Sequence, residues 1–215
     1  PVRVAVCDDE QREAEYVAQQ IYQQKRIHGA KYADFAVLYR SNHQARIFEQ
    51  ALRAAHIAYT ISGGQSFYDK AEIKDVLAYM RVLANPNDDP AFLRAATTPK
   101  RGIGDTTLGK LNDYAKQHEC SLFEAAGSLH ALTALSGKSR ESLQQFMALL
   151  HDYGRRAQED DAGATIQDLL KDIDYENHLL AMSDNNSKMA ENRWRNVQEL
   201  CDWLARKGEE GERSL

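Results

Sequence analysis

Tyr59-Thr60-Ile61-Ser62-Gly63-Gly64 is the stretch at which the sequence changes character. On its N-terminal side, short runs of β-branched and alternating residues are typical of strands. On its C-terminal side, apolar residues recur every three to four positions, which is typical of helices. We therefore expect two domains, residues 1–64 and residues 65–215. Gly63 and Gly64 are candidates for a hinge between them, because glycine tolerates backbone angles that other residues avoid. The alternative is a simple turn.

Upstream of this stretch, the pattern predicts a small α/β unit. Strands are expected at residues 2–7, 35–39 and 59–61. Helices are expected between them, from about residue 10 to residue 27 and from about residue 43 to residue 55. This β-α-β-α-β order is typical of a three-strand parallel unit.

Downstream, the sequence predicts an all-α region. Ile73, Val76, Leu77 and Met80 share one helix face, and similar stripes recur up to Leu204. The chain as a whole is therefore expected to be predominantly helical.

Composition excludes several classes of protein. The 215 residues carry a net charge of −5, so a uniformly basic nucleic-acid binder is excluded and any phosphate contact must be local. No apolar stretch is long enough to cross a bilayer, so no membrane contact is expected. The three cysteines and seven histidines show no metal-ligand spacing, so we expect no metal site. Cysteine usage and the lack of a secretion signal indicate the cytoplasm.

Ser136-Gly137-Lys138-Ser139 has the ending of a phosphate-binding P-loop, but the position that must be glycine is Leu132. A turn between helices is the better interpretation of this segment.

Tyr39-Arg40-Ser41-Asn42 lies where an expected strand ends and a helix begins. Ligands of open α/β sheets bind at the carboxyl ends of strands. A tyrosine at that edge can stack on a flat base, and an arginine can bind phosphate through two parallel hydrogen bonds. The alternative is a tyrosine that closes the core beside an arginine on the rim.

The segment from Thr98 to Thr107 predicts a tight turn between two helices. Its glycines let the backbone approach a ligand closely, and the following helix offers free N–H groups to an anion. Residues 92–111 hold four basic side chains and one acidic one, a net charge of +3. This pattern favours contact with a phosphate backbone without base reading, and the alternative is an ordinary helical hairpin. The candidate DNA-binding residues are Thr98, Lys100, Arg101, Gly102, Ile103, Gly104, Thr106 and Thr107.

Several blocks in the same order resemble the UvrD/Rep/PcrA-type superfamily 1 DNA helicases. The segment from Tyr39 to Arg46 resembles motif IV of that family. Further similar blocks are residues 61–75, 83–89, 98–104, 173–176 and 196–200. The Rep branch is the most similar, most clearly in Asp174-Tyr175-Glu176.

The resemblance implies an ATP-driven 3′→5′ DNA translocase with subdomains 1A, 1B, 2A and 2B. Residues 1–64 would be the first part of 2A and residues 65–215 most of a truncated 2B. Tyr39 would stack on adenine and Arg40 would reach the γ-phosphate. The turn at Gly102-Ile103-Gly104 would grip the duplex backbone, and Gly63-Gly64 would be the hinge between 2A and 2B.

The family's Walker A motif and acidic box do not occur here, and both belong to 1A. The resemblance therefore implies a fragment of an ATP hydrolase that is itself inactive. ATP and Mg²⁺ would serve the parent enzyme, and neither is expected to bind the fragment. The expected partners are a single-strand/duplex DNA junction, the missing 1A, 1B and 2A segments, and possible replication proteins. The alternatives are a stand-alone helical DNA-binding module and a protein-interaction domain.

Overall fold

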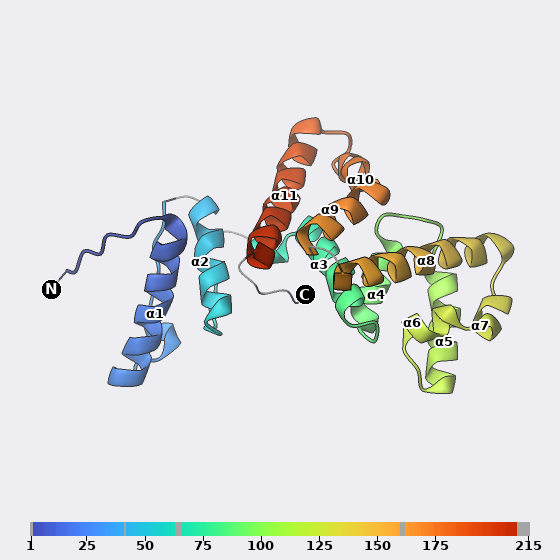
Figure 1. The fold of residues 1–215 in the computed structure, drawn as a ribbon, viewed down its shortest axis with the longest axis horizontal. Helices are drawn as coiled ribbons and strands as arrows, with labels where there is room; N and C mark the ends of the chain where they lie inside the picture. The colour runs from blue at the N-terminus through green and yellow to red at the C-terminus, as the bar shows by residue number, and fades with distance from the viewer. Residues whose placement is uncertain (1, 41, 63–65, 160–161, 210–215) are drawn as a thin grey trace. The chain divides into compact units, whose positions relative to one another are not determined.

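Two units make up the chain, and their boundary lies between Lys70 and Ala71. The computed structural model describes residues 2–40, 42–62, 66–159 and 162–209, and Figure 1 shows their helices. The expected hinge residues Gly63 and Gly64 lie outside the described residues, so the hinge stays a prediction. Each unit is described by itself below.

The first unit begins with helix α1 (Glu10–His28), whose ends follow from its sequence. At the start, the side chain of Asp9 accepts a 2.7 Å hydrogen bond from the backbone N–H of Arg12. At the end, Gly29 takes a left-handed conformation (φ 67°), and its N–H bonds the carbonyl of Lys25. The predicted helix from about residue 10 to residue 27 is confirmed.

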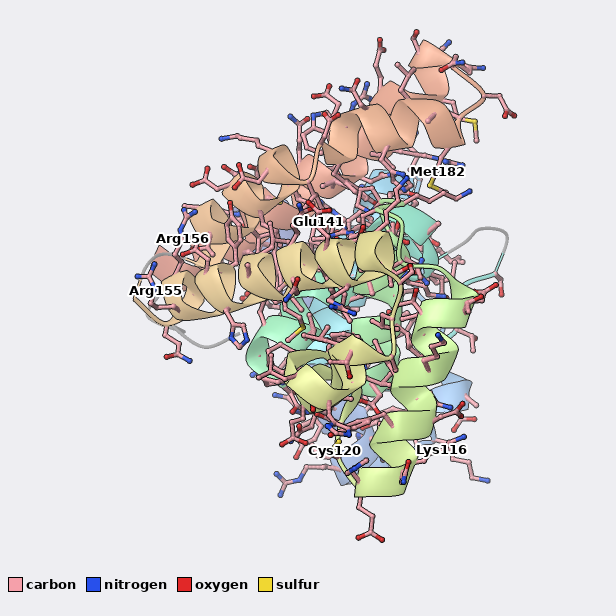
Figure 2. All side chains as sticks on the ribbon, turned by 90° about the vertical axis from the view of Figure 1, so that its right-hand side faces the viewer. Lys116, Cys120, Glu141, Arg155, Arg156 and Met182 are labelled. Carbon is pink, nitrogen blue, oxygen red and sulfur yellow. The ribbon has the colours of Figure 1, made fainter. Side chains whose placement is uncertain are left out.

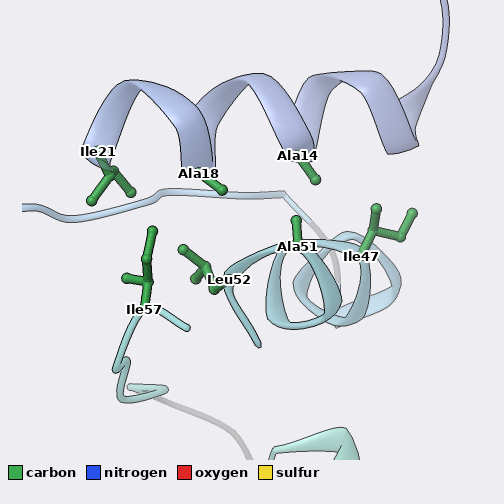
Figure 3. Packing of buried hydrophobic residues seen from close by; sticks show 7 residues of the cluster. All are labelled: Ala14, Ala18, Ile21, Ile47, Ala51, Leu52 and Ile57. Carbon is green, nitrogen blue, oxygen red and sulfur yellow. The ribbon is translucent and has the colours of Figure 1, made fainter. Parts of the chain in front are cut away.

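Helix α2 (Asn42–Ala54) packs on α1, and small side chains let the two helices approach. Figure 3 shows the buried residues at this contact. They are Ala14, Ala18 and Ile21 from α1, Ile47, Ala51 and Leu52 from α2, and Ile57 after it. Two short 3-10 turns, η1 (Tyr32–Asp34) and η2 (Phe67–Asp69), complete this unit.

The expected three-strand parallel sheet is wrong. None of residues 2–7, 35–39 or 59–61 forms a strand in the described part of the chain. A strand needs a neighbour for its backbone N–H and C=O groups, and two strands alone are marginal in water. Val2, Val4 and Val6 are 95%, 88% and 95% exposed, so that alternating run packs against nothing in this unit.

The alternation at residues 35–39 has a different cause. Phe35 and Val37 pack against the core between α1 and α2, whereas Leu38 is 93% exposed. An extended segment that lies on a helix pair shows the same period of two as a strand in a sheet. The apolar run at residues 35–39 therefore contains two side chains that pack on a core, but that core is a helix pair and not a sheet.

The second unit consists of helices in its described residues, which confirms the all-α prediction there. Its elements are α3 (Ala71–Ala84), α4 (Asp89–Thr97), α5 (Asp105–His118), α6 (Leu122–Gly127), α7 (Leu129–Thr133), α8 (Gly137–Glu159), α9 (Ala162–Asp172), α10 (Tyr175–Met182) and α11 (Ser187–Glu209).

Helix α3 lies at the centre of this unit and contacts α4, α8 and α11. Its residues Ile73, Val76 and Val82 are fully buried. Helices α9 and α10 pack on α11, while α5, α6 and α7 form a cluster beside α8. At the α8–α9 contact, Tyr153 donates a 2.6 Å hydrogen bond to Asp172. Arg156, which is labelled on α8 in Figure 2, pairs with Asp168 at 2.7 Å.

Candidate nucleotide and nucleic-acid interfaces

Tyr39 and Arg40 lie in the extended segment that leads into α2. Phe35 and Val37 anchor this segment to the core, and both Tyr39 (36% exposed) and Arg40 reach solvent. The backbone N–H of Arg40 donates a 2.9 Å hydrogen bond to the side chain of Gln44, in the first turn of α2. The backbone of Arg40 is therefore fixed at the start of a helix, with its side chain exposed.

This arrangement leaves an aromatic ring and a guanidinium side by side in sequence and open to a ligand. A partly exposed phenol ring can stack on a base, and an exposed guanidinium can form charge-assisted bonds to phosphate. The alternative in which Tyr39 closes the core does not fit its exposure, since Phe35 and Val37 take that role. Ser41, the next residue of the motif, lies outside the described residues.

The segment after the glycine pair is tied to α2 through Glu49. This carboxylate is buried, and it accepts hydrogen bonds from Tyr59 (2.9 Å), from Ser66 (2.5 Å) and from the backbone N–H of Phe67 (3.2 Å). Arg53 adds a cation–π contact over the ring of Tyr68, 4.1 Å from its centroid. Residues 66–69 therefore belong structurally to the first unit.

In the second unit, the turn between α4 and α5 contains the candidate DNA-binding residues. Gly102 has φ 83°, a conformation that favours glycine. A Cβ atom at Gly102 would also lie 3.0 Å from the Oγ of Ser142 on α8. Gly104 caps α5 with an extended backbone, so its φ does not require glycine.

These candidates divide by exposure. Ile103 and Thr107 are buried and anchor the turn to the core, and Thr98 and Arg101 are half-buried. The exposed candidates are Lys100, Gly102, Gly104 and Thr106. The turn therefore presents one lysine, two glycine backbones and a threonine hydroxyl to solvent.

Three of the four basic side chains in residues 92–111 bind groups within the protein. Arg94 pairs with the buried carboxylate of Asp75 at 2.7 Å, and Lys110 donates to the carbonyl of Ala134 at 2.8 Å. Arg101 donates to the carbonyls of Thr98 and Pro99. Within the described part of the chain, only Lys100 of the four has no hydrogen bond or ion pair. The net charge of +3 therefore overstates the charge that this surface offers to a ligand.

A network of buried polar groups contacts the turn on its side that faces the core. The sequence analysis assigned this network no role. Tyr79 is 1% exposed, and its hydroxyl lies within hydrogen-bond distance of the carbonyls of Ala95 (3.1 Å) and Thr98 (2.6 Å). Burial raises the pKa of Tyr79 to about 12, partly opposed by Arg101. The phenol therefore stays protonated at neutral pH.

Asp75 joins a second part of this network. It accepts a 2.7 Å hydrogen bond from Tyr175 as well as the ion pair from Arg94. Burial and then the charge of Asp75 raise the pKa of Tyr175. The only sequence signal for Tyr175 was the Asp174-Tyr175-Glu176 block, which gave it no task.

The described residues contain no cluster of three or more His, Cys, Asp or Glu side chains that could hold a metal ion. They also contain no helix long and apolar enough to span a membrane.

The sequence profile of a protein family described as "UvrD-like helicase C-terminal domain" matches residues 1–213. The chain belongs to this family. This UvrD-like helicase domain is 42% identical over 203 residues to the ATP-dependent DNA helicase Rep of Salmonella typhimurium, and 41% identical to Rep of Escherichia coli. It is also 41% identical over 141 residues to the ATP-dependent DNA helicase PcrA of Staphylococcus aureus.

The two Rep matches cover 94% of this UvrD-like helicase domain but only 30% of each relative, and the PcrA match covers 66% and 19%. The chain therefore spans less than a third of the length of these relatives. The resemblance expected from the motif blocks is confirmed at the level of the family.

Proposed function

We propose that this chain forms part of an ATP-dependent DNA helicase of the Rep type. The main support is the 41–42% identity to two Rep helicases over 94% of the chain. In this proposal the first unit contributes to an ATP site and the second unit contacts duplex DNA. The chain alone does not hydrolyse ATP, because its sequence has no complete P-loop to hold the β- and γ-phosphates.

At the ATP site, Tyr39 stacks on the adenine and Arg40 binds the γ-phosphate. Their exposure and the fixed backbone of Arg40 support these roles. An arginine at this place stabilises negative charge that develops on the transferring phosphoryl group. Mg²⁺, when bound, would neutralise charge on the β- and γ-phosphates.

At the duplex, the turn from Thr98 to Thr107 approaches the phosphate backbone. Its exposed glycines permit close contact, and Lys100 supplies a charge that no group in the described residues pairs with. With one such lysine at the turn, we expect weak binding that depends on salt and not on sequence.

A chimaera tests the proposal for the whole protein. The 203-residue matching segment of E. coli Rep is replaced by this chain, and DNA-stimulated ATP hydrolysis and unwinding are measured. We expect both activities, whereas the isolated 215-residue chain should hydrolyse no ATP. A folded chimaera that binds ATP and DNA but neither hydrolyses nor unwinds would contradict the proposal.

The alternative is a protein-interaction domain. It is favoured because three of the four basic side chains in residues 92–111 already bind groups within the protein. Titration of the isolated chain with a short duplex at increasing salt separates the two functions. A DNA-binding turn gives an affinity that falls with salt, and an interaction domain shows no salt-dependent affinity.

A further inference from the structure

Arg101 stands next to the free Lys100 in sequence, but its guanidinium is held inside the turn. Its Nε donates to the carbonyl of Pro99 at 3.2 Å, and its Nη2 donates to the carbonyl of Thr98 at 3.1 Å. Nη2 also donates to the hydroxyl of Tyr79. The planar guanidinium lies over the ring of Phe146, 4.8 Å from its centroid. Arg101 thus uses its Nε, its Nη2 and its flat face within the protein.

Tyr79, which accepts this hydrogen bond from Arg101, also contacts the backbone of the turn. Its oxygen accepts from Arg101, so its single proton is left for the carbonyl of Thr98 or of Ala95. The carbonyl of Thr98 is therefore approached by two donors, one from Arg101 and one from Tyr79. Since Tyr79 belongs to α3, these bonds attach the turn to the central helix of the unit.

These bonds determine which groups of the turn face solvent. They direct the carbonyl oxygens of Thr98 and Pro99 inward, onto a cation and a phenol. Carbonyl oxygens at the surface would repel an anionic phosphate backbone, so turning them inward favours its approach. Lys100 and Gly102, which follow these carbonyls, are exposed.

We infer that Arg101, together with Tyr79, is a positioning residue that holds the turn in the shape that contacts duplex phosphate, and that Arg101 does not itself bind that phosphate. This inference rests on the proposed function of the turn. Two adjacent basic residues then have different roles. Lys100 offers a positive charge to the phosphate, and Arg101 holds the backbone of the turn in place. A lysine cannot replace Arg101, because an ammonium lacks the planar fork and the stacking face.

The test compares Arg101→Lys, which keeps the charge, with Lys100→Ala, which removes one. Affinity of the 215-residue chain for a short duplex is measured against salt by fluorescence anisotropy. For Arg101→Lys we expect about a tenfold loss of affinity with an unchanged salt slope, as a loss of one to two internal hydrogen bonds predicts. For Lys100→Ala we expect the slope to fall by about 0.9, the value of one phosphate contact.

A second measurement is the rate of amide hydrogen exchange in the same variants without DNA. Arg101→Lys and Tyr79→Phe should each speed exchange in residues 98–104, and the double variant should add little to either, because both remove the same support. Lys100→Ala should leave this exchange unchanged. Thermal unfolding of every variant shows that the unit still folds.

Two outcomes would overturn the inference. One is an Arg101→Lys chain with unchanged affinity and exchange, together with an Arg101→Ala chain whose salt slope falls as in Lys100→Ala. The other is exchange in residues 98–104 that responds to none of these changes. If the unaltered chain shows no salt-dependent affinity for duplex, the proposed function is overturned instead, and the exchange measurement alone decides whether Arg101 holds the turn.

Discussion

The hydroxyl of Tyr175 donates a 2.7 Å hydrogen bond to the carboxylate of Asp75, a residue 100 positions earlier in the chain. Both side chains are buried, and Arg94 completes the site with an ion pair to the same carboxylate. The bond joins α10 to α3, and it lies in the same unit as the turn that we propose contacts DNA. A buried carboxylate needs such partners, because burial of a charge is costly unless it is hydrogen-bonded.

Tyr175→Phe should therefore destabilise the second unit by about 1–3 kcal/mol, since it leaves Asp75 with one fewer donor in a dry site. Denaturant unfolding of the 215-residue chain measures the loss. Tyr114→Phe is the matched control, because the hydroxyl of this half-buried residue lies within hydrogen-bond distance of the neutral Ser128 and not of a carboxylate in the described residues. A loss no larger than that of the control would show that the Asp75 bond contributes little.

Helix positions in this chain were largely predictable from local signals. The caps at Asp9 and Gly29 and the stripe from Ile73 to Met80 are short-range patterns, and each corresponds to an observed helix. The strands were not predictable in this way, because a strand depends on a distant neighbour. The alternation of Phe35 and Val37 records burial alone, and burial against a helix pair gives the same pattern.

The candidate sites show the same division. The position of Tyr39 and Arg40 just before a helix was predicted from local signals, whereas the sequence left open whether Tyr39 closes the core or faces solvent. The internal bonds of Arg94, Arg101 and Lys110 were not predicted, because each has a partner 19 to 24 positions away in the chain. Sequence gives the number of charges, and only the structure shows which of them remain available to a ligand.

Gly163 and Gly109 both lie in helices, but the space around them differs. A Cβ atom at Gly163 would lie 2.9 Å from the backbone of Ala205 on α11, whereas one at Gly109 would meet no atom within 4 Å. Gly163→Ala should therefore push α9 from α11 and destabilise the unit by about 1–3 kcal/mol. Gly109→Ala should stabilise it by about 0.5–1 kcal/mol, because alanine loses less backbone entropy in a helix.

Thermal and denaturant unfolding of both variants measures these changes. The two substitutions add the same methyl group, so the sign of the effect depends on the surroundings alone. Equal effects of the same sign would contradict the close α9–α11 contact.

Stability should fall at alkaline pH. Burial raises the pKa of Cys201 from 9.0 to about 12, and the pKa of Tyr79 from 10.0 to about 12. Above its ordinary pKa, each group loses its proton in the unfolded chain but keeps it in the folded chain, so rising pH favours unfolding. The contribution of each group is fully present below its unfolded pKa and is lost as pH rises toward about 12.

Denaturant unfolding between pH 8 and pH 11 checks this expectation, with a slope that approaches about 1.4 kcal/mol per pH unit for each group. Cys201→Ala should remove the part of the slope that begins near pH 9 and leave the later part, which comes from tyrosines with raised pKa values such as Tyr79, Tyr153 and Tyr175. A variant that keeps the full slope would show that the thiol of Cys201 ionises equally in both states.

Glu49→Ala should release the segment that follows the glycine pair. The carboxylate binds Ser66 and the backbone of Phe67, so its loss leaves both donors unpaired and costs the first unit about 1–3 kcal/mol. Limited proteolysis and hydrogen exchange at residues 66–69 measure the release. Glu15→Ala, on the exposed face of α1, is the control. Equal protection of this segment in both variants would contradict its attachment through Glu49.

Arg40 and Tyr39 should affect different kinetic parameters in the Rep chimaera. Arg40→Ala should lower kcat for ATP hydrolysis by about a hundredfold or more, because it removes a charge that acts mainly in the transition state. Tyr39→Ala should raise KM more than it lowers kcat, because stacking on a base is equally strong before and during the reaction. Arg12→Ala is a suitable control, since its exposed guanidinium pairs with Glu15 on the surface of α1. An Arg40→Ala chimaera with unchanged kcat would remove Arg40 from the ATP site, even if the turn from Thr98 to Thr107 still binds duplex DNA.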